Sequence, residues 1–217
     1  MKKAIKHISA TALAVAFLLC SAASARAIPV ATAAPASAST TSWFAVAQNS
    51  ASTFTPRSAK DLTSSDLKLL GLIDWTQCYV TNNETWKIQS FVTTYLGAKK
   101  VLSIQCGSQD TQGYLHVALP ATGRQQQWRD RITQAQPGAN TDTWDDFMWW
   151  LAQQTWTNPA VSVEQGIGKV CRSAPIQMFG TNSNGVRVLK YTFNPSFAWS
   201  ITQDRLITAI PTTTATC

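Results

Sequence analysis

The side chain best suited to proton transfer in this 217-residue chain is His116, which lies in the short apolar segment Gly113–Val117. An imidazole changes its charge near neutral pH and therefore serves as a general acid or base. The alternative is a structural histidine, either hydrogen-bonded inside the domain or lying on its surface. His116 is thus a candidate catalytic residue whose surroundings decide between these roles.

Cationic side chains in the second half of the chain offer a second kind of chemistry, the binding of a phosphate or an oxyanion. They lie on or beside expected strands, at Lys169, Arg172, Arg187, Lys190 and Arg205. Several of them could therefore converge on one face of a sheet. Charges on the outer face of a half-buried sheet are also expected without any function.

Other catalytic chemistries have little support. Asp145 and Asp146 are adjacent carboxylates, but they fall in the first turn of an expected helix, where acidic side chains oppose the helix dipole. The sequence has no GxSxG segment of the kind that presents a nucleophilic serine. It also has no CxxC pair, so we expect neither a metal site nor a cofactor.

Residues 1–27 have the pattern of a secretory signal peptide. Three lysines precede an apolar run, Ile8–Cys20, and Ala25–Ala27 supplies a small-x-small cleavage site. The apolar run is too short to span a bilayer comfortably, and no later run approaches ~20 residues. Leu19 stands where a bacterial lipidation site usually has a small residue, which disfavours a lipid anchor on Cys20. We therefore expect a secreted, extracellular protein without a membrane-spanning segment.

Removal of this leader changes the charge of the chain. The formal net charge of the whole sequence is +7, with 18 Lys and Arg against 11 Asp and Glu. The leader contains four of the cations and no acid, so the remainder has a net charge of +3. A dedicated nucleic-acid binder neutralises many phosphates and usually has a larger excess.

The cysteines fit an oxidising compartment. Four of them, Cys78, Cys106, Cys171 and Cys217, lie beyond the leader, and an even number in a secreted protein indicates two disulfides. Three pairings are possible. We favour Cys78–Cys106 with Cys171–Cys217, since each bond would then bracket one continuous structural block.

The rest of the sequence divides into a short segment and one domain. Residues 28–42 are almost wholly Ala, Ser, Thr and Pro and predict a flexible segment, because they bury too little apolar surface to offset the entropy of ordering. Residues 43–217 contain all nine tryptophans and have the length of a single globular domain.

In the first half of this domain the apolar residues mainly recur at the spacing of a helix. Capping patterns and apolar periodicity predict helices from about Thr63 to Asp74, from Asn82 to Gly97, over Arg124–Ala135 and from Thr143 onward, with a short strand at Val101–Ile104. The stripe of the fourth helix consists of Trp144, Phe147, Met148 and Leu151.

After Pro159 the apolar residues alternate, as they do in strands. Asn184-Gly185 predicts a hairpin turn, and Arg205–Ile210 predicts a last strand. Simple alternation would place Arg205 and Thr208 on opposite faces of that strand. The expected fold class is α+β, with N-terminal helices packed on a C-terminal antiparallel β-meander and two disulfides.

Segment 113–148 resembles a group of secreted actinobacterial proteins, through Gly113–Val117, the helix around Trp128, and Trp144–Met148. The ending Arg205–Pro211 is similar to the last strand of toxin domains with pancreatic-ribonuclease-like or barnase–EndoU–colicin–RelE-like folds. Those domains often close with an Ile-Thr-Ala-aromatic-Pro segment. The resemblance covers roughly residues 113–212, and its motifs are short.

This resemblance implies RNA cleavage by transesterification. His116 matches the histidine of the helical half and Thr208 the hydroxyl residue of the last strand, while Arg172 or Lys190 would supply the cation. The histidine would take the 2′-hydroxyl proton, and the cation and Thr208 would stabilise charge on the phosphate.

One departure from the family pattern bears on activity. Related domains commonly have a second His or Arg a few residues after the first, whereas the next basic residue here is Arg124. A weak enzyme, an enzyme with a different second group and a fold that has lost its activity all fit this pattern. The two functions expected are therefore a secreted ribonuclease-like effector acting on RNA and a non-catalytic secreted protein that binds a protein or a cell-wall partner.

Overall fold

A computed structural model describes residues 42–56, 69–214 and 216–217, which belong to one compact unit. The expected signal peptide, residues 1–27, lies outside the described residues, as does the segment 28–42 except for its last residue. The described part contains two β-sheets with ten strands in all, and four α-helices. None of its helices is long and apolar enough to cross a membrane.

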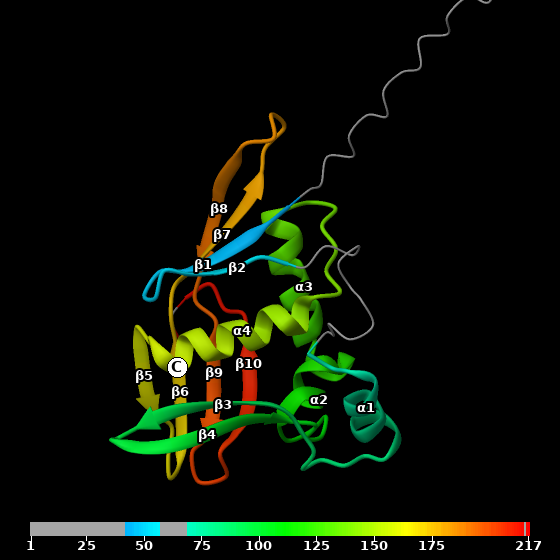
Figure 1. Ribbon diagram of the computed structural model, residues 1–217, viewed down its shortest axis with the longest axis vertical. Coiled ribbons are helices and arrows are strands. Elements are labelled where there is room, and N and C mark those ends of the chain that lie inside the picture. The colour runs from blue at the N-terminus through cyan, green and yellow to red at the C-terminus, as the bar shows by residue number, and fades with distance from the viewer. Residues whose placement is uncertain (1–41, 57–68, 215) are drawn as a thin grey trace, which may run out of the picture. The chain divides into compact units, whose positions relative to one another are not determined.

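The larger sheet has six strands in the order β3-β4-β10-β9-β6-β5 (Figure 1). All neighbouring pairs are antiparallel except β4 and β10, which run parallel and pair only at Ser103 and Arg205. Its strands are β3 (Lys87–Tyr95), β4 (Ala98–Gln105), β5 (Val161–Glu164), β6 (Lys169–Ser173), β9 (Ser196–Ser200) and β10 (Arg205–Ile210).

The smaller sheet has four antiparallel strands in the order β2-β1-β7-β8. They are β1 (Phe44–Ala47), β2 (Ser52–Phe54), β7 (Ile176–Thr181) and β8 (Arg187–Phe193). The turn between β7 and β8 contains Gly185 with a φ of 76°, which agrees with the hairpin predicted from Asn184-Gly185.

The helices lie between and beside the sheets. They are α1 (Leu72–Trp75), continued by a π-helix η1 (Thr76–Val80), α2 (Gly113–Ala118), a short 3₁₀-helix η2 (Pro120–Thr122), α3 (Arg124–Ala135) and α4 (Trp144–Thr157). Helix α4 crosses one face of the six-stranded sheet (Figure 1). There Trp156 packs on Trp199 of β9 at 5.8 Å between ring centroids, and Trp149 packs on Phe91 of β3 at 5.6 Å.

The expected fold, with N-terminal helices packed on a C-terminal meander, is wrong, because strands of two sheets make up more of the described residues than the four helices do. The helix predicted from Asn82 to Gly97 is strand β3, most of whose residues are β-branched or aromatic and therefore favour a strand. Leu96 and Gly97 both have positive φ, 49° and 80°, and form the two-residue turn of the β3–β4 hairpin. Gly97, which the sequence pattern assigns to a helix end, therefore turns a hairpin.

Other predictions from the sequence are confirmed. Helix α3 covers the predicted range, α4 carries the predicted apolar stripe on its buried side, and β10 has the predicted bounds. Both disulfides have the favoured pairing, Cys78–Cys106 and Cys171–Cys217. The capping pattern expected at Thr63 lies outside the described residues.

Candidate functional site

A β-bulge in β10 decides which of its side chains share a face. Leu206 pairs with Trp199 and Thr208 pairs with Ala198, so Ile207 is an extra residue between them. Because of this bulge, Arg205 and Thr208 point to the same side of the sheet, whereas simple alternation predicted opposite sides. Leu206 and Ala209 instead share the other side, and both are fully buried.

The side of the sheet that carries Arg205 is the one opposite α4. Trp199 contacts Trp156 of α4, so Ala198 and Ser200, its neighbours along β9, face away from the helix. We call this surface the outer face. The pairing registers place on it Val92, Lys99, Val101, Ser103, Val163, Lys169, Cys171, Ser196, Ala198, Ser200, Arg205 and Thr208.

The outer face is basic and its central side chains are small. The six strands contain a single carboxylate, Glu164, which accepts a hydrogen bond from Tyr95 on the helix side at 2.9 Å. Val92 and Val101 remain 60% and 46% exposed, so the β3–β4 part of this face is open to solvent. The part of this face formed by β6 and β9 is contacted by the last two residues. Cys217 forms a disulfide with Cys171 of β6, and the Thr216 carbonyl oxygen accepts a hydrogen bond from Ser196 Oγ of β9 at 2.5 Å.

One arginine contacts Thr208, and a second lies on the same face of the same strand. Arg124, the first residue of α3, donates a hydrogen bond from Nη1 to Thr208 Oγ1, and Arg205 lies on the same strand and face. Neither guanidinium forms an ion pair with a carboxylate of the described residues, and Arg205 Nε has no hydrogen-bond partner there. Partial burial lowers the pKa of Arg124. These two guanidinium groups can bind a phosphate group and neutralise its charge.

His116 lies on α2, which packs against β10 and β4. Its ring is partly exposed, and Nδ1 lies 2.7 Å from the carbonyl oxygen of Gln109. Because a carbonyl oxygen can only accept, the neutral ring has its proton on Nδ1. Nε2 is then left with a free lone pair, as a general base requires.

The two cations that the sequence suggested for this site lie elsewhere. Arg172 pairs with Phe197, which puts it on the helix side of the sheet, across from Thr208. Lys190 belongs to β8 in the four-stranded sheet. The structure therefore does not bring these two residues to Thr208, and Arg124 contacts it instead. Arg124 begins a predicted helix and not a strand, so no sequence pattern indicates that it contacts β10.

Arg172 has contacts that indicate a structural role. Its guanidinium carbon is 3.8 Å from the ring centroid of Trp156, its Nη1 donates to the Trp156 carbonyl oxygen, and its Nε donates to Ser162 Oγ at 3.2 Å. Burial lowers the pKa of Arg172, the expected effect of packing a cation under a helix.

Arg172→Ala is expected to lower the free energy of unfolding by about 1–3 kcal/mol, because it removes a cation–π contact and leaves the Trp156 carbonyl without its charged donor. Urea denaturation of the variant measures this loss. Lys190→Ala removes the same charge from an exposed strand position and should change stability by less than about 0.5 kcal/mol. Equal effects of the two substitutions would contradict the structural role of Arg172.

No protein family, characterised protein or solved structure matches the chain. The resemblance to ribonuclease-type toxin domains and the secretion of the chain therefore stay predictions.

Proposed function

We propose that this protein binds RNA on the outer face and cleaves it by transesterification, with His116 as general base. The observation that carries the proposal is the composition of that face. It combines two arginines that form no ion pair with a carboxylate of the described residues, the Arg124–Thr208 contact, and an adjacent helix, α2, whose histidine has Nε2 free. We further infer that the protein acts outside the cell, which its two disulfides support.

The charge pattern favours a local phosphate site over a broad polyanion surface. Outside the expected leader the net charge is only +3, but Arg124, Lys169 and Arg205 lie together around β10 and β6. If these three cations contact three phosphates, the logarithm of RNA affinity should fall with the logarithm of salt concentration with a slope of about −2. Such binding is modest, and its salt dependence is weaker than that of a protein that contacts about six to ten phosphates.

The reaction would use these residues in separate roles. His116 Nε2 takes the proton of a ribose 2′-hydroxyl, whose oxygen attacks the neighbouring phosphorus. A bond forms between the 2′-oxygen and phosphorus, the bond to the 5′-oxygen breaks, and a cyclic phosphate and a 5′-hydroxyl result. Arg124 and Thr208 stabilise the charge that develops on the phosphate oxygens. The 5′-oxygen receives its proton from water or from the protonated His116.

Arg205→Ala is expected to weaken binding of single-stranded RNA about tenfold, because one charged contact to a phosphate is lost. The salt slope should become less steep by about 0.7. Filter binding or fluorescence anisotropy at several salt concentrations measures both quantities.

The matched control is Arg187→Ala, which removes the same charge from β8, where Arg187 lies 5.1 Å above the ring of Phe44. This variant should bind RNA like the wild-type protein. If both substitutions weaken binding equally, RNA responds to net charge alone, and the outer face is not its site.

A second candidate function, non-catalytic binding of a protein or cell-wall partner, is favoured by one observation. The segment α1–η1 exposes several large apolar side chains, including Leu72 at 76%, Ile73 at 68% and Val80 at 58%. Exposed apolar residues that cluster in this way often mark an interaction surface. Purified protein that neither binds nor cleaves labelled RNA would favour this second function.

A further inference from the structure

A pocket of about 380 Å³ lies between the α1–η1 segment and the first turn of α4, away from the outer face. The residues that matter for its chemistry are Trp75, Tyr79, Tyr114, Arg129, Trp144 and Asp145. We call it the aromatic pocket. None of the residues assigned to RNA cleavage lines it, so a ligand in this pocket does not depend on that function.

The walls of the aromatic pocket include two pairs of stacked rings. Trp75 and Tyr79 stack at 5.8 Å between centroids with an interplanar angle of 22°, and Tyr114 and Trp144 stack at 5.9 Å and 27°. The faces of aromatic rings are electron-rich and attract cations. Trp75 and Tyr79 are partly exposed, so a ligand can reach them from solvent.

A carboxylate lies at the inner side of this pocket. Asp145 is only 4% exposed, and it accepts hydrogen bonds from the Tyr114 hydroxyl at 3.2 Å and from the backbone N–H of Asp146 at 3.0 Å. It forms no ion pair with a cation of the described residues. A buried carboxylate without a cationic partner is costly, and a bound cation would relieve that cost.

The groups that surround Asp145 determine its titration. Burial, followed by the charge of Asp146 on the same helix, raises the pKa of Asp145 to about 6. Burial and the charge of Asp145 raise the pKa of Tyr79 from η1 and of Tyr114 from α2, so both phenols stay protonated. Arg129 of α3 lines the same pocket. It lies 3.7 Å from Asp142, which also lines the pocket, and this pair partly neutralises itself.

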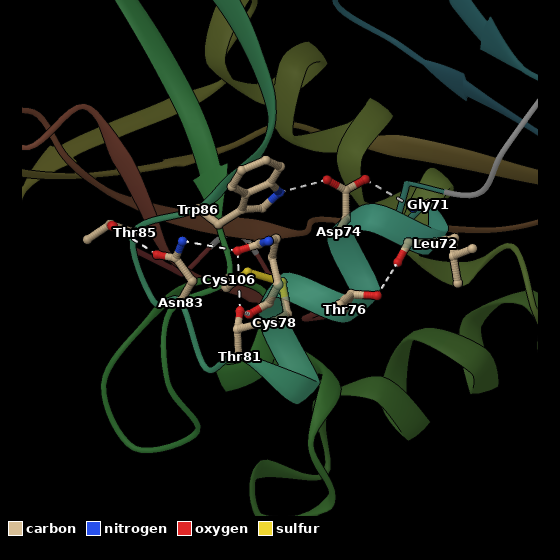
Figure 2. Close-up of a disulfide and its surroundings, with 11 residues drawn as sticks. Gly71, Leu72, Asp74, Thr76, Cys78, Thr81, Asn83, Thr85, Trp86 and Cys106 are labelled. Atoms are coloured by element: carbon tan, nitrogen blue, oxygen red, sulfur yellow. Dashed lines mark hydrogen bonds between the residues drawn. A yellow bond between two sulfur atoms is a disulfide. The ribbon is translucent and has the colours of Figure 1, made fainter.

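The wall formed by η1 is fixed to the rest of the domain (Figure 2). Cys78, next to Tyr79, forms the disulfide with Cys106 at the end of β4. One turn earlier, Asp74 accepts a hydrogen bond from Trp86 Nε1 at 2.8 Å and another from the backbone N–H of Gly71 at 3.1 Å. These bonds hold the Trp75–Tyr79 pair in place before any ligand binds, which reduces the entropy lost on binding.

We propose that the aromatic pocket binds an organic ammonium group, with the stacked rings around the cation and Asp145 as its counter-ion. Aromatic rings combined with a carboxylate are the usual means of recognising substituted ammonium ions. The ammonium group belongs either to a small free molecule or to a lysine side chain of a peptide. The same chemistry serves both sources, and the probes below distinguish them.

The Asp145 contribution to folding stability and the affinity for an ammonium ligand should depend on pH in opposite directions. The folded-state pKa of Asp145 is raised above its unfolded value, so the folded protein binds more protons than the unfolded chain between pH 4 and 6. The Asp145 contribution to stability therefore falls as the pH rises through this window. Ammonium binding needs the charged carboxylate and should strengthen over the same window.

The test uses two ammonium probes, choline and Nα-acetyl-lysine methylamide, whose side-chain ammonium is free. The neutral control is 3,3-dimethyl-1-butanol, an isostere of choline. Isothermal titration calorimetry of the full chain should show binding of at least one ammonium probe at pH 7.5 and an affinity about tenfold lower at pH 5, because most of Asp145 is then neutral. The neutral isostere should bind much more weakly than choline. The probe that binds identifies the source of the ammonium group.

Asp145→Asn is the decisive variant, since it keeps the size of the side chain but removes its charge. It should lose the pH dependence of binding and bind the ammonium probe at pH 7.5 about tenfold more weakly or worse. Its melting temperature should be at least that of the wild-type protein at pH 7.5, which shows that it folds. Trp75→Ala, at a partly exposed position, provides a second folded variant that should also bind weakly.

Three results would overturn the proposal. The first is that neither ammonium probe binds to the wild-type protein. The second is that choline and its neutral isostere bind equally well. The third is that Asp145→Asn binds the probe as tightly as the wild-type protein, in which case the buried carboxylate has only a structural role.

Discussion

Replacing His116 by alanine is expected to reduce the rate of RNA cleavage by about 10²–10⁴-fold, the usual contribution of a positioned acid or base. The ring is partly exposed, and its hydrogen bond to the Gln109 carbonyl oxygen leaves Nε2 unprotonated in the neutral form. The substitution removes this base and leaves the cations of the outer face in place. RNA binding should therefore persist while cleavage is lost. Incubation of the purified protein with end-labelled RNA measures cleavage, and anisotropy measures binding.

His116→Asn is the matched control for structure. An asparagine amide can donate to the Gln109 carbonyl oxygen in place of Nδ1, but it has no group able to accept the 2′-hydroxyl proton. It should be as inactive as the alanine variant and more stable. The stability lost in the alanine variant should be about 0.5–1.5 kcal/mol, the usual contribution of one hydrogen bond. Wild-type protein that leaves RNA intact, combined with a marked drop in the melting temperature of His116→Ala, would show that the imidazole is structural.

The local patterns of α3 and α4 could be predicted because their apolar residues keep one spacing over twelve and fourteen residues. The segment that forms β3 shows the limit of this reasoning. Ile88, Phe91 and Tyr95 also fit a helical stripe, yet the chain pairs in register with β4 over most of its length. Periodicity does not separate the two outcomes in such a segment, and the preference of Val and Thr for strands favours pairing.

The site depends on two features that have no local signal. The bulge at Ile207 moves Arg205 and Thr208 to the same face, and only the pairing with β9 reveals the extra residue. Arg124 reaches Thr208 across 84 positions of sequence. A single sequence gives residue types and periods but not such distant contacts, so it offers Arg172 and Lys190 as equal candidates for the cation.

Asp145 illustrates how a residue assigned a local role can acquire another one from tertiary packing. Its place in the first turn of α4 was predicted, and it does accept a bond from the backbone N–H of Asp146. Its burial under Tyr114 comes from α2, which precedes it by about thirty residues. The cost of that burial is what makes the carboxyl a candidate ligand-binding group.

Phe147→Ala should have the largest effect on stability of the changes considered, because Phe147 of α4 joins the four-stranded sheet to the helices. Its ring contacts Trp43 at 5.0 Å and Phe54 of β2 at 5.3 Å between centroids. It also contacts Trp128 of α3 at 6.1 Å and Phe193 of β8 at 6.4 Å. The side chain is fully buried, so its removal leaves a cavity that rigid aromatic neighbours cannot fill.

The expected loss in the free energy of unfolding is about 3–5 kcal/mol, a large share of the total stability of a domain of this size. Phe147→Leu retains most of the volume and should lose less, so it stays measurable if the alanine variant fails to fold. Val92→Ala removes apolar atoms at a position that is 60% exposed and should cost less than about 0.5 kcal/mol. Urea denaturation compares the three variants with the wild-type protein. A loss in Phe147→Ala no larger than that in Val92→Ala would mean that the aromatic cluster does not hold the four-stranded sheet against the helices.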